Sequence, residues 1–176
     1  IYSGVQPRLM GARPIMLVNN PAATDPTWQQ LLSFLRADPT DDRIWTEGVF
    51  VSGDFAQMLH NNAEAAGIRA ALVGVFFEGQ IIGHGLNAIK TTDRGLVYVD
   101  STGPTLEQSL RVALYRISGG APLEWDKIAY MVKGKEYGAI SINQANSPEY
   151  SYYERIGKTF TNWGEMGIVE SIQLYW

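Results

Sequence analysis

The chain has 176 residues, of which 45% are hydrophobic, which is enough for one folded domain with a real core. Its formal net charge is −4 and its lysines and arginines form no basic stripe, which argues against nucleic-acid binding. The longest apolar run, residues 70–77, is far too short to cross a bilayer, so we expect no membrane insertion. Because cysteine is absent, the sequence excludes disulfides and thiolate metal ligands.

The chain reads as a single domain spanning residues 1–176. It begins at Ile1 rather than at a methionine, which favours processing or trimming and leaves a removed signal peptide, and hence secretion, open. Residues 1–25 are rich in proline and glycine and are expected to wrap the surface. No linker, repeat or low-complexity tract divides the rest, so we expect a core at about 26–103 and a C-terminal helix and strands over 104–176. Oligomeric state and compartment have no signal in the sequence.

Two helices are predicted from apolar residues spaced three and four positions apart. Asp25 and Pro26 are a good opening for the first, because aspartate caps free amides and proline tolerates the first turn. Residues 38–41 end it. The second is predicted from Ser52 to about Gly67, because glycine adopts the left-handed cap conformation without strain. The apolar faces of the two helices are formed by Trp28, Leu31, Leu32 and Leu35, and by Phe55, Met58, Leu59, Ala63 and Ala66.

Three consecutive strands are predicted next, over residues 70–77, 81–91 and 96–101. The breaks between them, at 78–79 and 92–95, each contain a glycine that supplies a positive φ angle, which is typical of hairpin turns.

The C-terminal part is predicted to hold a helix over 106–117 and strands over 138–143 and 168–176. The aromatic-rich segment 148–156 is ambiguous. One helix feeding an antiparallel sheet, with other helices around it, is an α+β arrangement.

Three short motifs carry candidate chemistry. Ser52 begins the run Ser-Gly-Asp-Phe-Ala, and the helix it opens continues into Ala-Gly-Ile-Arg-Ala at 66–70. His84 stands between two glycines within the strand predicted over 81–91, and Asp100 lies in Val-Asp-Ser-Thr at 99–102. In this order the motifs resemble the transglutaminase-like superfamily, with the resemblance covering residues 45–103.

The resemblance implies a papain-like fold, in which a nucleophile helix packs on an antiparallel sheet. It also implies a catalytic triad at Ser52, His84 and Asp100, acting on peptide or protein amides, with cysteine expected where Ser52 stands. The sequence indicates no cofactor. With two histidines and no metal-ligand spacing, it indicates no metal either.

The same residues make chemical sense without the resemblance. Acyl transfer needs a nucleophile within hydrogen-bond reach of a base that a third group orients. A helix start offers free amides and positive dipole, which favour a thiolate and can hold an oxyanion. A serine hydroxyl cannot form the thiolate–imidazolium pair, because it does not ionise in the range where a thiol does.

Each residue also has a plainer structural interpretation. Ser52 is a good helix N-cap, and His84 and Asp100 are compatible with a hydrogen-bonded strand histidine and a turn aspartate.

His60, the only other histidine, is predicted at the surface of the second helix. The polar residues 19–25 read as a turn, with lining of the cleft as the alternative. The C-terminal aromatic residues favour core over a sugar or peptide platform; they are Tyr150, Tyr152, Tyr153, Phe160 and Trp163.

Three functions therefore compete. In the first, the chain is a cysteine acyl-transferase or peptidase in which position 52 was changed to serine to silence it. In the second, the serine is natural and the domain is a pseudoenzyme that binds a peptide or glycan-linked ligand. In the third, the weakest, Ser52 acts as a slow serine hydrolase.

Overall fold

The computed structural model describes residues 14–120, 124–147 and 166–176. Its elements in chain order are α1 (Trp28–Ala37), α2 (Ser52–Ala65), β1 (Ala71–Phe77), β2 (His84–Thr91), β3 (Gly95–Asp100), α3 (Leu106–Ile117), β4 (Lys127–Tyr130), β5 (Gly138–Ser141), α4 (Ile142–Ala145) and β6 (Val169–Tyr175). The strands form one antiparallel sheet in the order β5-β4-β3-β2-β1-β6. The predicted α+β class and antiparallel sheet are confirmed. The ambiguous segment 148–156 and the five C-terminal aromatics named above lie outside the described residues.

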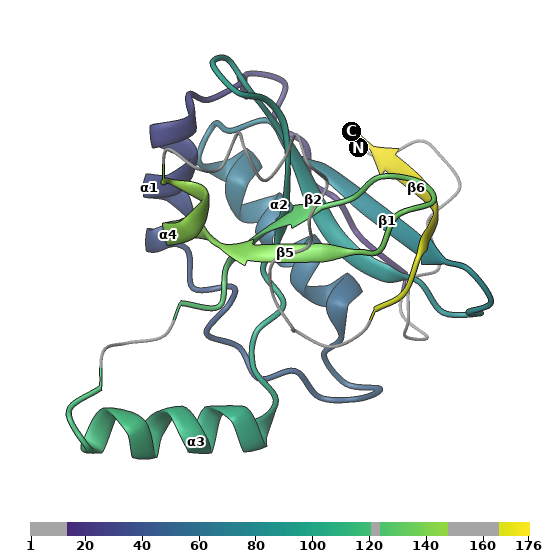
Figure 1. The fold of residues 1–176 in the computed structure, drawn as a ribbon. Coiled ribbons are helices and arrows are strands. Elements are labelled where there is room, and N and C mark those ends of the chain that lie inside the picture. Colours follow the sequence, from purple (N-terminus) through teal and green to yellow (C-terminus); the bar gives the residue numbers. More distant parts are fainter. Residues whose placement is uncertain (1–13, 121–123, 148–165) are drawn as a thin grey trace.

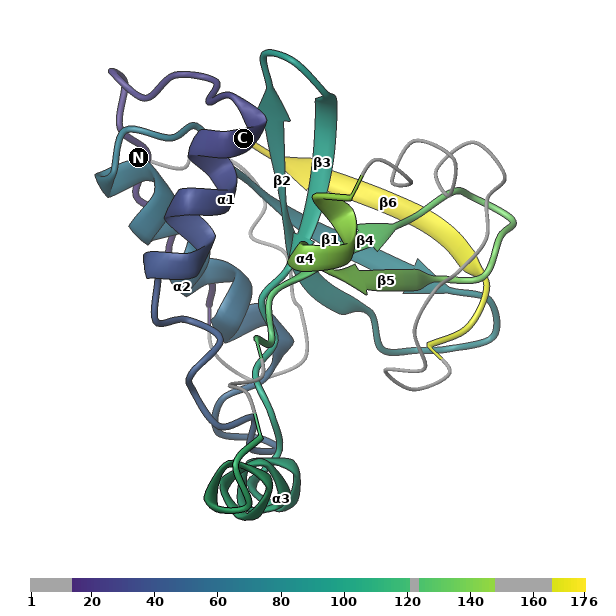
Figure 2. The same cartoon turned by 60° about the vertical axis from the view of Figure 1, so that its left-hand side comes forward.

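Helices α1 and α2 cover one face of the sheet side by side, whereas α3 lies apart from the body (Figures 1 and 2). The core beneath α1 and α2 joins their apolar faces to the sheet through residues such as Trp28, Leu59, Ile89 and Val99. Alternate residues of β1 point to opposite faces: Val73 and Val75 pack into the second core with β6, while Leu72 faces α2. Because both of its faces are covered, β1 is an unbroken apolar run.

The first helix begins two residues later than Asp25 and Pro26 predict. Thr27 caps α1, and its side chain and that of Gln30 form a reciprocal capping box. Asp25 instead forms an ion pair with Arg69, 3.0 Å from its guanidinium. The predicted end at residue 38 is confirmed.

The second helix begins at Ser52 as predicted, but Ser52 is not its cap. The N-cap is Val51, whose backbone N–H donates to the Asp54 carboxylate at 2.9 Å. The hydroxyl of Ser52 is thereby left for another partner. Gly67, with φ of +80°, follows the end of the helix, as predicted.

The three predicted strands and both hairpins are present, with Gly79 and Gly95 at positive φ. The second strand starts at His84 rather than at residue 81. Ile81 and Ile82 are exposed, so their apolar character does not mark a position in the sheet. Because of this late start, His84 is the first residue of β2.

The C-terminal half shows two departures from prediction. The short strand β4 was not predicted, and the predicted strand over 138–143 ends at Ser141, which caps the one-turn helix α4. The predicted helix 106–117 has the bounds of α3, and none of its side chains is buried. Within the described residues, every helix is too short or too polar to cross a membrane.

Candidate functional site

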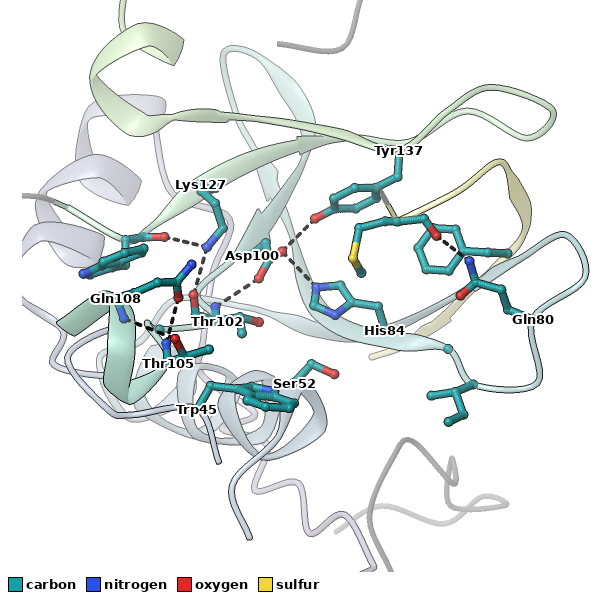
Figure 3. Close-up of a pocket in the computed structure, with 16 residues that line it drawn as sticks. Trp45, Ser52, Gln80, His84, Asp100, Thr102, Thr105, Gln108, Lys127 and Tyr137 are labelled. Carbon is teal, nitrogen blue, oxygen red and sulfur yellow. Dashed lines mark hydrogen bonds and ion pairs between the residues drawn. The ribbon is translucent and has the colours of Figure 1, made fainter. Parts of the chain in front are cut away.

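The three candidate residues meet at one end of the sheet. Ser52 opens α2, His84 is the first residue of β2, and Asp100 is the last residue of β3. Because β2 and β3 are antiparallel neighbours, the first residue of β2 and the last residue of β3 lie at the same end of the sheet. All three line a cavity of about 410 Å³ (Figure 3).

His84 and Asp100 form a buried pair. Nε2 of His84 lies 2.8 Å from Oδ2 of Asp100, and the two residues are 8% and 4% exposed. The other oxygen of Asp100, Oδ1, accepts the backbone N–H of Thr102 at 3.0 Å. An ionised carboxylate can only accept, so Nε2 carries the proton of the neutral imidazole and Nδ1 is left with the lone pair.

Asp100 is held ionised by its surroundings. Burial by itself would raise the pKa of this carboxyl, but His84, Lys127 and the hydroxyl of Tyr137 together hold the pKa well below its usual range. The carboxylate is thus a permanent acceptor for His84 and a fixed negative charge behind the imidazole.

Ser52 is joined to the strand that carries His84. Its Oγ accepts the backbone N–H of Gly85 at 3.1 Å, and the residue is only 4% exposed. This approach requires a glycine, because a Cβ on Gly85 would lie 2.9 Å from both Cα and N of Gly53. The start of α2 therefore lies directly against the backbone that follows His84.

Nδ1 of His84 has no hydrogen-bond partner among the described residues. Ser52 lines the same cavity as His84, and its side chain lies below the imidazole ring in the view of Figure 3. The arrangement thus offers a base, a carboxylate that orients it, and a hydroxyl beside it, which is the set that nucleophilic acyl transfer uses.

Tyr137 is a site residue that the sequence did not reveal. Its hydroxyl donates to Oδ2 of Asp100 at 2.7 Å, the same oxygen that pairs with His84. Its ring stands edge-on to His84, with centroids 5.9 Å apart. Burial, and then the charge of Asp100 that accepts its proton, raises the pKa of Tyr137 well above its usual value.

Lys127 is a second such residue, carried by the unpredicted strand β4. Its Nζ donates to the carbonyls of Thr102 and Trp125, at 2.9 and 2.8 Å. The lysine lines the cavity and is 4% exposed, so its charge acts on Asp100 with little screening from solvent. It also ties the end of β3 to the segment before β4.

The cavity has two unlike walls. On the side of α3, the cavity is lined by Trp45, Thr105 and Gln108 (Figure 3). The backbone N–H of Trp45 donates to the carbonyl of Pro104 at 2.8 Å. On the other side, Gln80 donates to the carbonyl of Met166 at 2.8 Å, where Phe77 and Ile82 add apolar surface. An extended ligand crossing the site would meet aromatic and hydroxyl groups on one side and mostly apolar groups on the other.

Two other predictions fall away from the cavity. His60 is fully buried in α2, with Nε2 3.0 Å from the side-chain oxygen of Asn19, so its predicted surface placement is wrong. Residues 19–25 form the predicted turn, in which Asn20 accepts the N–H of Ala22 and of Ala23, and they do not line the cavity. Among the described residues, no group of three or more histidine, aspartate or glutamate side chains is placed to hold a metal ion.

Comparison with family models, curated proteins and solved structures finds no match for this chain. The geometry of the site therefore carries the functional argument.

Proposed function

We propose that this chain is a transglutaminase-like domain built for acyl transfer or hydrolysis at peptide or protein amides, and that serine at position 52 silences it. The observation that carries the proposal is the bond between Nε2 of His84 and Asp100, made while Oγ of Ser52 lies on the amide of the next residue, Gly85. Both residues line the same cavity, which supports a reaction in which a group at position 52 passes its proton to His84.

A thiol at position 52 would complete the chemistry. It would pass its proton to Nδ1 of His84, and Asp100 would stabilise the imidazolium that forms. The N–H of Gly85, which now donates to Ser52, would donate to the thiolate, and the first amides of α2 would add positive dipole. The thiolate would attack the amide carbonyl, and the imidazolium would return the proton to the leaving amine.

The serine hydroxyl cannot perform the first step, in which the group at position 52 gives its proton to His84 before the attack. It does not ionise in the accessible pH range, so it would have to lose its proton to His84 during the attack itself. A slow serine hydrolase is therefore a weaker proposal than a silenced cysteine site.

A natural pseudoenzyme is the second candidate, and the two-walled cavity favours it. Aromatic and hydroxyl groups beside an intact His84–Asp100 pair retain the means to bind a peptide or glycan-linked ligand without turnover. The two candidates differ in what the source gene encodes at position 52, which is cysteine for an engineered change and serine for a pseudoenzyme.

The test is the pH dependence of alkylation by iodoacetamide in a Ser52→Cys variant. The chain has no other cysteine, so the signal belongs to one position. An ordinary thiol titrates near pH ~8.5, and we expect the Ser52→Cys thiol to react well below that pH because His84 and the start of α2 stabilise its thiolate.

Two controls make the result specific. Adding His84→Ala should return the alkylation profile toward that of an ordinary thiol. Ser118→Cys, at the exposed end of α3, should show the ordinary profile from the start. A Ser52→Cys profile that matches Ser118→Cys and ignores His84 would remove the acyl-transfer proposal and leave the binding domain.

A further inference from the structure

The hydroxyl of Tyr137 shares one oxygen atom with the imidazole of His84. Both donate to Oδ2 of Asp100, from 2.7 and 2.8 Å, while Oδ1 is taken by the N–H of Thr102. Tyr137 reaches this oxygen from the segment just before β5, on the far side of β3 and β4 from His84. Figure 3 shows the carboxylate between the tyrosine and the histidine.

Tyr137 is built to remain a donor. It is 8% exposed, and its ring is fixed by edge-on packing against Phe77 and His84, with both pairs of centroids 5.9 Å apart. Burial and the neighbouring charge of Asp100 keep its proton on the phenol oxygen. Tyr137 therefore stays a hydrogen-bond donor to Asp100 in the pH range where an exposed phenol would begin to ionise.

A donor on Oδ2 draws negative charge away from the oxygen that His84 uses. The carboxylate then stabilises an imidazolium less than it would with His84 as its only partner on that atom.

We infer that Tyr137 is a positioning residue of this site, whose hydroxyl weakens the hold of Asp100 on a protonated His84 and so sets the pH range over which the base functions. The inference rests on the proposed function, because it assumes that His84 exchanges a proton with a group at position 52. It adds Tyr137 to the proposed set of Ser52, His84 and Asp100, through the bonds that Tyr137 and His84 both make to Asp100.

The experiment adds Tyr137→Phe to the Ser52→Cys variant and repeats the alkylation profile with iodoacetamide. Without the hydroxyl, Asp100 stabilises the imidazolium more strongly, and the imidazolium stabilises the thiolate. We expect the midpoint of alkylation to move to lower pH. Tyr98→Phe is the matched control, because Tyr98 lies on β3 but makes no hydrogen bond to Asp100.

A second variant tests the same inference without removing the hydroxyl. Incorporation of 3-fluorotyrosine at position 137 keeps the shape and makes the phenol a stronger donor. The expected shift is then in the opposite direction, to higher pH. This variant decides the matter even where Tyr137→Phe does not fold.

The outcomes separate the two proposals. An ordinary profile in the parent Ser52→Cys variant would overturn the proposed function. A low-pH profile in the parent that neither change at Tyr137 moves would leave the proposed function standing and make Tyr137 a purely structural residue. A shift of the Tyr137→Phe profile upward, toward that of an ordinary thiol, would also contradict the inference, because the tyrosine would then support the imidazolium rather than weaken it.

Discussion

The backbone N–H of Gly85 donates to Oγ of Ser52 over 3.1 Å, and the residue that precedes this amide is His84. The relative positions of Ser52 and His84 thus depend on a contact between the start of α2 and the start of β2, in which one partner is a main-chain group. A main-chain donor does not depend on a rotamer, so this contact restrains the spacing as the proposed acyl-transfer site requires.

Replacement of Gly85 by alanine should disturb this contact. The added Cβ would lie 2.9 Å from Cα and N of Gly53, and backbone cannot yield as a flexible side chain does. We expect a loss of about 1–3 kcal/mol in the free energy of unfolding, typical of overpacking, measured by urea denaturation. An unchanged stability would mean that α2 and β2 separate easily.

Asp100→Asn should destabilise the protein most at neutral pH. The pKa of Asp100 is lower in the folded state than its unfolded value of 3.8, so its carboxylate contributes stability above about pH 4 that is lost as the pH falls. The amide removes this contribution and leaves a buried pair broken, at a cost on the order of 3 kcal/mol. Urea denaturation from pH 7 to pH 2 should show the gap between the two proteins narrowing toward acid. A constant gap would contradict the ionised state of Asp100.

His60→Gln should make the protein less sensitive to mild acid. Burial lowers the pKa of His60 below 6.5, against a smaller opposing effect of Glu64. The unfolded chain therefore binds a proton that the folded protein resists, and stability falls as the pH drops below about 6.5. Thermal unfolding of both proteins between pH 7.5 and pH 5 should show the steeper decline in the parent. Parallel curves would mean that His60 titrates normally.

Two leucines on different helices give a matched pair for the core. Leu59 in α2 is 0% exposed, whereas Leu110 in α3 is 59% exposed. Leu59→Ala should cost about 2–5 kcal/mol in the free energy of unfolding. Leu110→Ala should stay within about 0.5 kcal/mol, since α3 buries none of its side chains. Comparable losses from both would show that α3 is covered in solution.

The sequence predicted most of what depends on local patterns. The helical spacing in α1 and α2, the apolar run of β1 and the glycines of the two hairpins are local signals, and each gave the right element. The hairpin between β2 and β3 implies that these strands pair antiparallel. The positions of His84 and Asp100 on the two strands therefore predict that both lie at one end of the sheet, where α2 also places Ser52.

What the sequence missed depends on contacts between distant segments. The four residues of β4 are too few for a periodic signal, and Lys127 was missed with them. Tyr137 meets Asp100 only because β4 lies between β3 and β5. The surface placement of His60 was predicted from its polar neighbours Asn61 and Asn62, but the histidine itself is fully buried.

The central claim is that position 52 alone keeps this site from acyl transfer, and the most direct measurement is covalent acylation. The parent, Ser52→Cys and Ser52→Cys with His84→Ala would each be exposed to p-nitrophenyl acetate at neutral pH and analysed by intact-protein mass spectrometry with peptide mapping. The account predicts rapid acetylation at position 52 in Ser52→Cys, and little or none there in the other two. Acetylation of Ser52→Cys no faster than that of its His84→Ala counterpart would contradict it.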